Sequence, residues 1–179
     1  MTETRFVTVP APRYLVFLDF DGVLHTRQSG VHFARANALG SMLAAFEGLR
    51  VVVSSSWKEL YLLGELQRFC GPVLGPLLVG QTPDLVIPDG FEKPQVRLHA
   101  DGTIRTANAS ARLWYQQHAE ITTWLDDRRC TDIPWLAVDD FEHFFPPGCP
   151  ALYLVDDGLT EEDFSNISAR IESEVQRAS

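Results

Sequence analysis

The chain has 179 residues, and its 45% hydrophobic and 22% charged content is typical of one globular domain with a buried core. A formal net charge of −9 argues against a broad nucleic-acid interface, because binding to a phosphate backbone needs clustered Lys and Arg. The three cysteines form no CxxC pair, which indicates free thiols. No signal-peptide pattern or membrane-length apolar stretch is present, so we expect a cytoplasmic protein without a membrane partner.

Short apolar runs alternate with helical patterns along the chain. We expect buried strands at residues 14–18, 50–53, 73–79, 134–138 and 151–155. We expect helices at residues 33–46, 57–69 and 110–125, and a last helix capped by Thr160. This alternation predicts an α/β fold, a three-layer Rossmann-like domain in which helices cover both faces of a central parallel sheet.

One segment departs from the alternation. Residues 96–106 centre on Asp101-Gly102, with alternating apolar and polar residues on either side, which is typical of a β-hairpin. This hairpin belongs to an insertion, residues 83–108, that we expect to form a small flap or cap. Since no repeat or break in composition marks a second domain, we expect residues 1–179 to form one domain.

Two carboxylates directly follow the first strand, in the segment Asp19-Phe20-Asp21-Gly22-Val23-Leu24. Parallel sheets bind ligands at the carboxyl ends of their strands. Carboxylates this close repel each other unless they share a cation or a proton, and a simple turn does not need the first of them. Mg²⁺ takes one or two such oxygen ligands together with water and substrate phosphate. Asp19 and Asp21 therefore indicate Mg²⁺-dependent phosphoryl chemistry.

The DFDGVL segment resembles the DxDGT/V signature of the haloacid dehalogenase (HAD) superfamily, whose members are mostly phosphohydrolases. The resemblance implies that Asp19 is a nucleophile that forms an aspartyl-phosphate, and that Asp21 is the acid/base that protonates the leaving oxygen. It also implies that Asp19 and the backbone carbonyl of Asp21 bind Mg²⁺, and that the sheet has the strand order 5-4-1-2-3. A carboxylate nucleophile divides a hydrolysis into two easier steps, and a second carboxyl can transfer the proton.

The second and fourth strands also end in residues that match motifs of this family. The second strand is followed by three serines, and the resemblance implies that one hydroxyl binds phosphate, with Ser54 the best match and Ser55 the alternative. The fourth strand ends in Asp139-Asp140, which resembles the acidic motif that completes the metal site. Two other acidic pairs, Asp126-Asp127 and Asp156-Asp157, are expected outside the site because only the fourth strand neighbours the first in the family's order.

The third motif of the family, a Lys or Arg on the helix before the fourth strand, matches poorly. Alignment on the run Glu120–Leu125 places Gln117 at that position, with His118 beside it. A histidine there would make phosphate binding sensitive to pH. His25, His99 and His143 show no metal-ligand spacing and receive no role. The candidates for the basic residue that binds phosphate are His118, Arg112, Lys93 and Lys58.

These residues predict a Mg²⁺-dependent phosphomonoester hydrolase with an aspartyl-phosphate intermediate and a phosphorylated small molecule as substrate. The stretch before the second strand is too short for a large cap. The resemblance implies that family members with little cap often act on bulky substrates, because their site stays open. One alternative is a HAD-like binding or regulatory protein with impaired catalysis, since the third motif lacks its cation. Another is a nucleic-acid end-processing phosphatase, because similar capless domains with a Ser-Ser-Trp segment accompany RNA-repair modules. A signalling receiver domain would need an Asp and a Lys where Gly80-Gln81-Thr82 and Asp156 stand.

Overall fold

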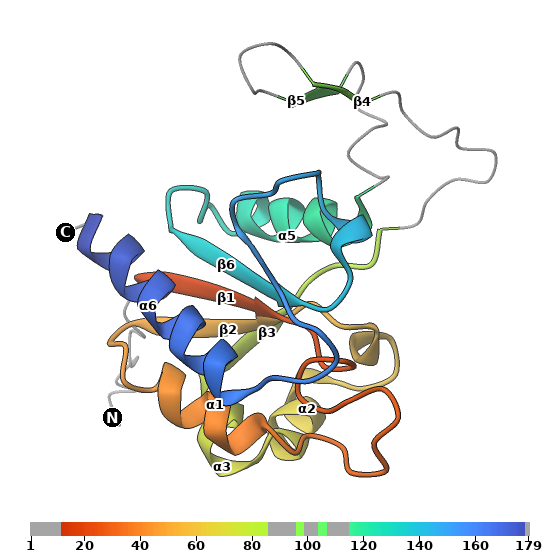
Figure 1. Ribbon diagram of the computed structural model, residues 1–179, viewed down its shortest axis with the longest axis vertical. Helices are drawn as coiled ribbons and strands as arrows, with labels where there is room; N and C mark the ends of the chain where they lie inside the picture. Colours follow the sequence, from red (N-terminus) through yellow and green to blue (C-terminus); the bar gives the residue numbers. More distant parts are fainter. Residues whose placement is uncertain (1–11, 86–95, 99–103, 107–114, 178–179) are drawn as a thin grey trace, which may run out of the picture.

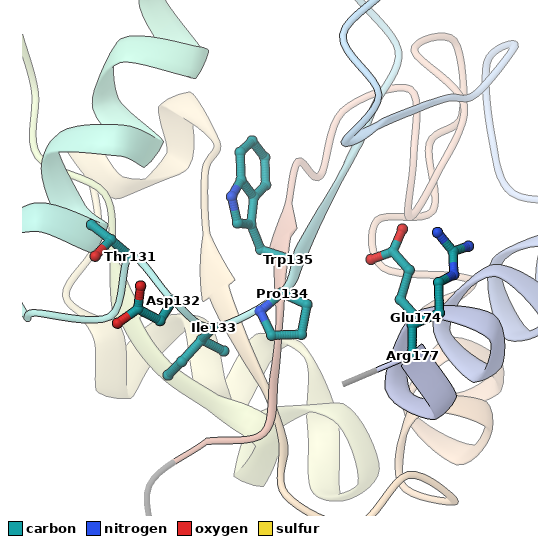
Figure 2. A pocket seen from close by; sticks show the side chains of 7 residues that line it. All are labelled: Thr131, Asp132, Ile133, Pro134, Trp135, Glu174 and Arg177. Carbon is teal, nitrogen blue, oxygen red and sulfur yellow. The ribbon is translucent and has the colours of Figure 1, made fainter. Parts of the chain in front are cut away.

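The computed structural model describes residues 12–85, 96–98, 104–106 and 115–177 (Figure 1). The strands are β1 Tyr14–Leu18, β2 Leu49–Val53, β3 Leu78–Gln81, β4 Val96–Leu98, β5 Ile104–Thr106, β6 Trp135–Asp139 and β7 Leu152–Leu154. The α-helices are α1 Ala36–Leu43, α2 Leu63–Phe69, α3 Gly71–Leu74, α5 Gln116–Asp127 and α6 Glu161–Arg177. Short 3-10 turns are η1 Ser56–Glu59, η2 Gly75–Leu77 and η3 Glu142–Phe144.

Five of these strands form a parallel sheet in the order β3-β2-β1-β6-β7. Counted along the sheet strands alone, this is the predicted order 5-4-1-2-3, and the α/β Rossmann-like fold is confirmed. α5 covers one face of the sheet, whereas α1 and α6 cover the other (Figure 1). Within the described ranges, no helix is long and apolar enough to cross a membrane.

The hydrophobic core has two parts, one on each face of the sheet, because successive side chains of a strand point to opposite faces. Val16 and Leu18 of β1 pack with the helices α1 and α6, whereas Leu15 and Phe17 pack under α5. The rings of Phe17 and Trp124 of α5 meet edge to face with centroids 5.6 Å apart. Burial on both faces explains why β1 is a continuous apolar run rather than an alternating one.

Two predicted helices are shorter in the structure. The helix expected at residues 33–46 begins only at Ala36, since Phe33 has a left-handed φ of 58° that no helix can include. The helix expected at residues 57–69 is divided into the 3-10 turn η1 and the helix α2, with an irregular link between them.

The predicted start of the third strand was wrong. Residues 71–77 form the short helical turns α3 and η2, and β3 begins only at Leu78. Pro72 and Pro76 each lie in the first turn of one of these pieces, where proline is favoured because its missing N–H is not needed. The Gly-Pro pairs therefore start helical turns and do not merely interrupt a strand.

Other predictions were confirmed where the structure describes them. β4 and β5 pair antiparallel, as expected of a hairpin, although the turn at residues 99–103 and most of the insertion lie outside the described residues. Thr160 caps α6: its hydroxyl accepts the N–H of Asp163 at 3.2 Å, and the Asp163 carboxylate accepts the N–H of Thr160 at 2.8 Å. This reciprocal pair is a capping box.

Candidate active site at the carboxyl edge of the sheet

Three carboxylates gather where β1 and β6 end. Asp19 follows β1, and Asp139 and Asp140 lie at the end of β6, which pairs directly with β1. One oxygen from each of the three carboxylates can be chosen so that these atoms lie within 4.8 Å of one another. Asp126-Asp127, at the last turn of α5, is exposed and lies outside this group. The structure therefore brings together the acids that strand order had singled out.

Burial makes this acidic cluster electrostatically unusual. Burial is the largest cause that raises the pKa of Asp19 to about 7, and the charges of Asp140 and Asp21 add to it. Burial, and then the charge of Asp19, raises the pKa of Asp139 to about 8. Carboxylates that repel one another in a buried site are stabilised by a shared proton or a cation. The three acids are hard oxygen donors and are consistent with a divalent metal site.

Asp140 is held by a glycine and an arginine. Its carboxylate forms an ion pair with Arg27 and lies so close to Gly22 that a Cβ at Gly22 would overlap it. Gly22 also has a φ of 68°, which favours glycine. The loop after β7 fixes the same region, since the Asp157 carboxylate accepts the backbone N–H of Arg27 at 2.7 Å. Gly22 is thus required both by the closeness of Asp140 and by its positive φ. Asp157 has a structural role, since it holds the backbone of Arg27.

Asp21 faces a different environment from the three clustered acids. Its side chain is about half exposed, and its two oxygens lie 2.9 Å from Nε2 of His25 and 2.9 Å from the indole nitrogen of Trp57. The His25 Nδ1 accepts the backbone N–H of Phe33 at 3.3 Å, which places the proton of a neutral imidazole on Nε2. Two N–H groups therefore orient the Asp21 carboxylate.

His25 and Trp57 had received no role from the sequence. His25 is four residues from Asp21 in a loop, and Trp57 is 36 residues away. Four residues is a helical spacing, but Asp21 and His25 lie in a loop, and 36 residues is too long for any local repeat, so periodicity could not have paired these residues. The only available signal for Trp57 was its place directly after the three serines.

Ser54 and Ser55 are buried directly after β2, beside the acidic cluster. The Ser55 hydroxyl is near enough to Asp19 to lower the pKa of that carboxyl, but it forms no hydrogen bond of normal geometry. The Ser54 hydroxyl likewise has no hydrogen-bond partner in the part of the chain that the structure describes. Buried hydroxyls without partners are rare, and at a ligand site they are available to the ligand.

The structure describes two of the four candidates for the third motif, His118 and Lys58, and gives them different surroundings. Gln117 donates a hydrogen bond to the backbone carbonyl of Ser54 at 3.0 Å. His118 lies beside Trp135 and Phe145, with ring centroids 6.1 and 6.4 Å away. Arg112 and Lys93 are outside the described residues.

Lys58 is the remaining candidate, and its buried ammonium group lies between β3 and α5. It forms an ion pair with the buried Glu120 and donates a hydrogen bond to the hydroxyl of Thr82 at 3.0 Å. The carboxylate of Asp84 lies 3.2 Å from the same nitrogen. Lys58 thus reaches the first turns of α5, the helix from which the family's third motif would supply its cation.

Comparison with known proteins agrees with this geometry. Residues 15–164 match the family described as the HAD domain in Swiss Army Knife RNA repair proteins. No curated protein and no solved structure matches the chain. The matched segment runs from β1 to the first turn of α6, and it contains both Asp19-Phe20-Asp21 and Asp139-Asp140. The chain therefore belongs to the HAD domain family of Swiss Army Knife RNA repair proteins, within the HAD superfamily.

Proposed function

We propose that this protein is a Mg²⁺-dependent phosphatase that removes a terminal phosphate from nucleic-acid ends. The observation that carries the proposal is the buried cluster of Asp19, Asp139 and Asp140, which lies beside two buried serine hydroxyls that make no normal hydrogen bond within the described residues. Net charge had favoured a phosphorylated small molecule as substrate. The match to a domain of RNA repair proteins favours the nucleic-acid alternative over it.

The chain's own residues supply both halves of the reaction. The Asp19 carboxylate attacks phosphorus, forming an oxygen–phosphorus bond while the bond to the leaving oxygen breaks, and Asp21 gives that oxygen a proton. Water then attacks the aspartyl-phosphate, and Asp21 takes the proton back. Phosphate and a free hydroxyl end are the products. Mg²⁺ held by Asp19, Asp139, Asp140 and the backbone carbonyl of Asp21 would neutralise charge on the phosphoryl group.

Phosphate binding falls to groups around the carboxyl edge of the sheet. We assign it first to Ser54, because its hydroxyl is buried and has no hydrogen-bond partner among the described residues. Ser55 is the neighbouring hydroxyl, and it also lies close to Asp19. Of the two described candidates, Lys58 is better placed than His118, since its ammonium group lies at this edge beside Thr82. His118 lies next to Trp135 and would have to reach the phosphate from there, so we rank it below Lys58.

The decisive variant is Asp19→Asn, which keeps the size of the side chain and removes the nucleophile. We expect phosphate release from single-stranded oligonucleotides with a 3′- or 5′-phosphate to fall at least about 10³-fold. The matched control is Asp126→Asn, which changes an exposed acid at the last turn of α5 and should keep full activity.

Three other results would change the proposal. Intact turnover by Asp19→Asn would remove the nucleophile assignment. Turnover of small phosphoesters but of no oligonucleotide would restore the small-molecule substrate. Mg²⁺ binding without turnover in a broad panel of phosphoesters would identify a binding or regulatory protein.

A further inference from the structure

The loop after β6 presents a group of aromatic rings next to the acidic cluster. Phe141 and Phe144 are 41% and 37% exposed, and their ring centroids lie 4.6 Å apart. His143 is also exposed, and its ring centroid lies 5.4 Å from that of Phe141. The turn η3 of this loop lies beside α5, past the end of β6 (Figure 1).

This loop is tied firmly to the site. Phe141 directly follows Asp140, and its backbone N–H donates to a carboxylate oxygen of Asp139 at 2.8 Å. At the other end of the turn, Phe145 is buried in the core under α5. The backbone that carries the exposed rings is therefore anchored at both ends, directly after the acidic cluster.

A second aromatic group, which contacts Asp21, already packs within the protein. Trp57 uses its indole N–H on Asp21 and packs against Phe33, with centroids 5.0 Å apart, and against Tyr61 at 5.5 Å. These rings join the hydrophobic core. In contrast, more than a third of the surface of each of Phe141 and Phe144 is exposed.

Charge limits the kind of nucleic-acid contact that can use this surface. The net charge of −9 and the exposed Glu142 inside the loop oppose a long run of phosphate contacts. Stacking of a base on an aromatic ring needs no positive charge and strengthens binding by about 5- to 150-fold per base. It favours an unpaired base, since a paired base, even at a duplex end, has at least one face covered by its neighbour.

We propose that Phe141 and Phe144 form a stacking platform for an unpaired base beside the terminal phosphate, so that the substrate is a single-stranded nucleic-acid end. The proposal rests on the proposed function, because the phosphate must lie at Asp19 for the base to reach the platform. Stacking accepts every base, so the platform selects unpaired ends of any sequence.

Binding can be measured without turnover in the Asp19→Asn protein. The probe is a single-stranded oligonucleotide with a terminal phosphate, labelled at its other end and followed by fluorescence anisotropy. Phe141→Ala/Phe144→Ala should raise its Kd about tenfold. Phe141→Leu/Phe144→Leu keeps apolar area without an aromatic face and should show most of that loss. Leu154→Ala, which changes an apolar residue on β7 that is 48% exposed, is the matched control.

A blunt duplex with the same phosphate completes the comparison, and thermal melting verifies that each variant folds. Unchanged affinity in the alanine variant, or an equal loss for the blunt duplex, would overturn the platform. A parent protein that binds no phosphorylated end would overturn it too. If the wild-type protein is a dimer, the alanine variant is a monomer and the Kd is unchanged, the two phenylalanines contact a second copy of the chain. That result would also overturn the platform.

The same measurements separate this inference from the proposed function. If wild-type protein releases no phosphate from any end but binds single strands through the two phenylalanines, the phosphatase fails and the platform stands. If wild-type protein releases phosphate and the loop variants bind as well as their parent, the platform fails and the phosphatase stands.

Discussion

Two sets of buried charges lie at the carboxyl edge of the sheet, and they are built in opposite ways. Asp19, Asp139 and Asp140 bring like charges together, whereas Lys58 and Glu120 form a pair of opposite charges. The pair satisfies its own charge and is held further by Thr82. Arg27 pairs with Asp140, but the pKa values of Asp19 and Asp139 remain raised.

The comparison shows how a functional charge can be told from a structural one. A matched buried pair gains its stability within the chain, so it needs nothing further. A like-charge cluster is stable only with a proton or a cation, so its retention in a buried position points to a ligand. Lys58 stands between the two cases, since it is structurally paired and also lies beside the proposed phosphate site.

The largest effect should come from the like-charge cluster. Asp139→Asn keeps an oxygen that can accept the Phe141 N–H but removes a metal ligand. We expect Mg²⁺ affinity, measured by titration calorimetry, to fall sharply and kcat/KM to fall at least about 10³-fold. Asp156→Asn changes an exposed acid after β7 and serves as the control. Full Mg²⁺ affinity in Asp139→Asn would show that the cluster is not the metal site.

The opposite-charge pair should respond mainly in stability. Lys58→Met leaves Glu120 buried and unpaired, which costs about 3–5 kcal/mol of unfolding free energy. Lys58→Met/Glu120→Leu should regain most of that loss, because an apolar pair replaces the ion pair. Urea unfolding measures both variants. If the double variant regains stability but not activity, Lys58 also binds phosphate; if it regains both, Lys58 is purely structural.

A smaller effect should appear in the pH dependence of the metal-free protein. Asp19 and Asp139 have pKa values of about 7 and about 8 in the folded state, against 3.8 in an unfolded chain. Between pH 4 and 8 the folded state therefore holds protons that the unfolded state releases, so stability falls as pH rises. Calorimetry should show a Tm that decreases over this range by more than it does in Asp139→Asn, and saturating Mg²⁺ should reduce the decrease. A wild-type Tm that falls no more than that of the variant would contradict the raised pKa values.

Much of the fold could be predicted because the relevant signals are local. A run of buried apolar residues marks β1 or β6 without reference to the rest of the chain, and Thr160 with Asp163 marks the start of α6. The failures arose where contacts across the fold overrule the local pattern. Phe33 leaves the helical conformation, and its ring packs against Trp57 of another element at 5.0 Å. The late start of β3 has a local cause, because Pro72 and Pro76 favour the helical turns that precede it.

The sequence by itself determined the acids at the ends of β1 and β6, because parallel strands bring their carboxyl ends to the same edge of the sheet. Only the tertiary structure decided which groups surround them. Lys58 meets Glu120 across 62 residues, and Trp57 meets Asp21 across 36. Such partners depend on how α5 and η1 are rotated and placed against the sheet. That placement is set by packing throughout the core and by no repeat within a single element.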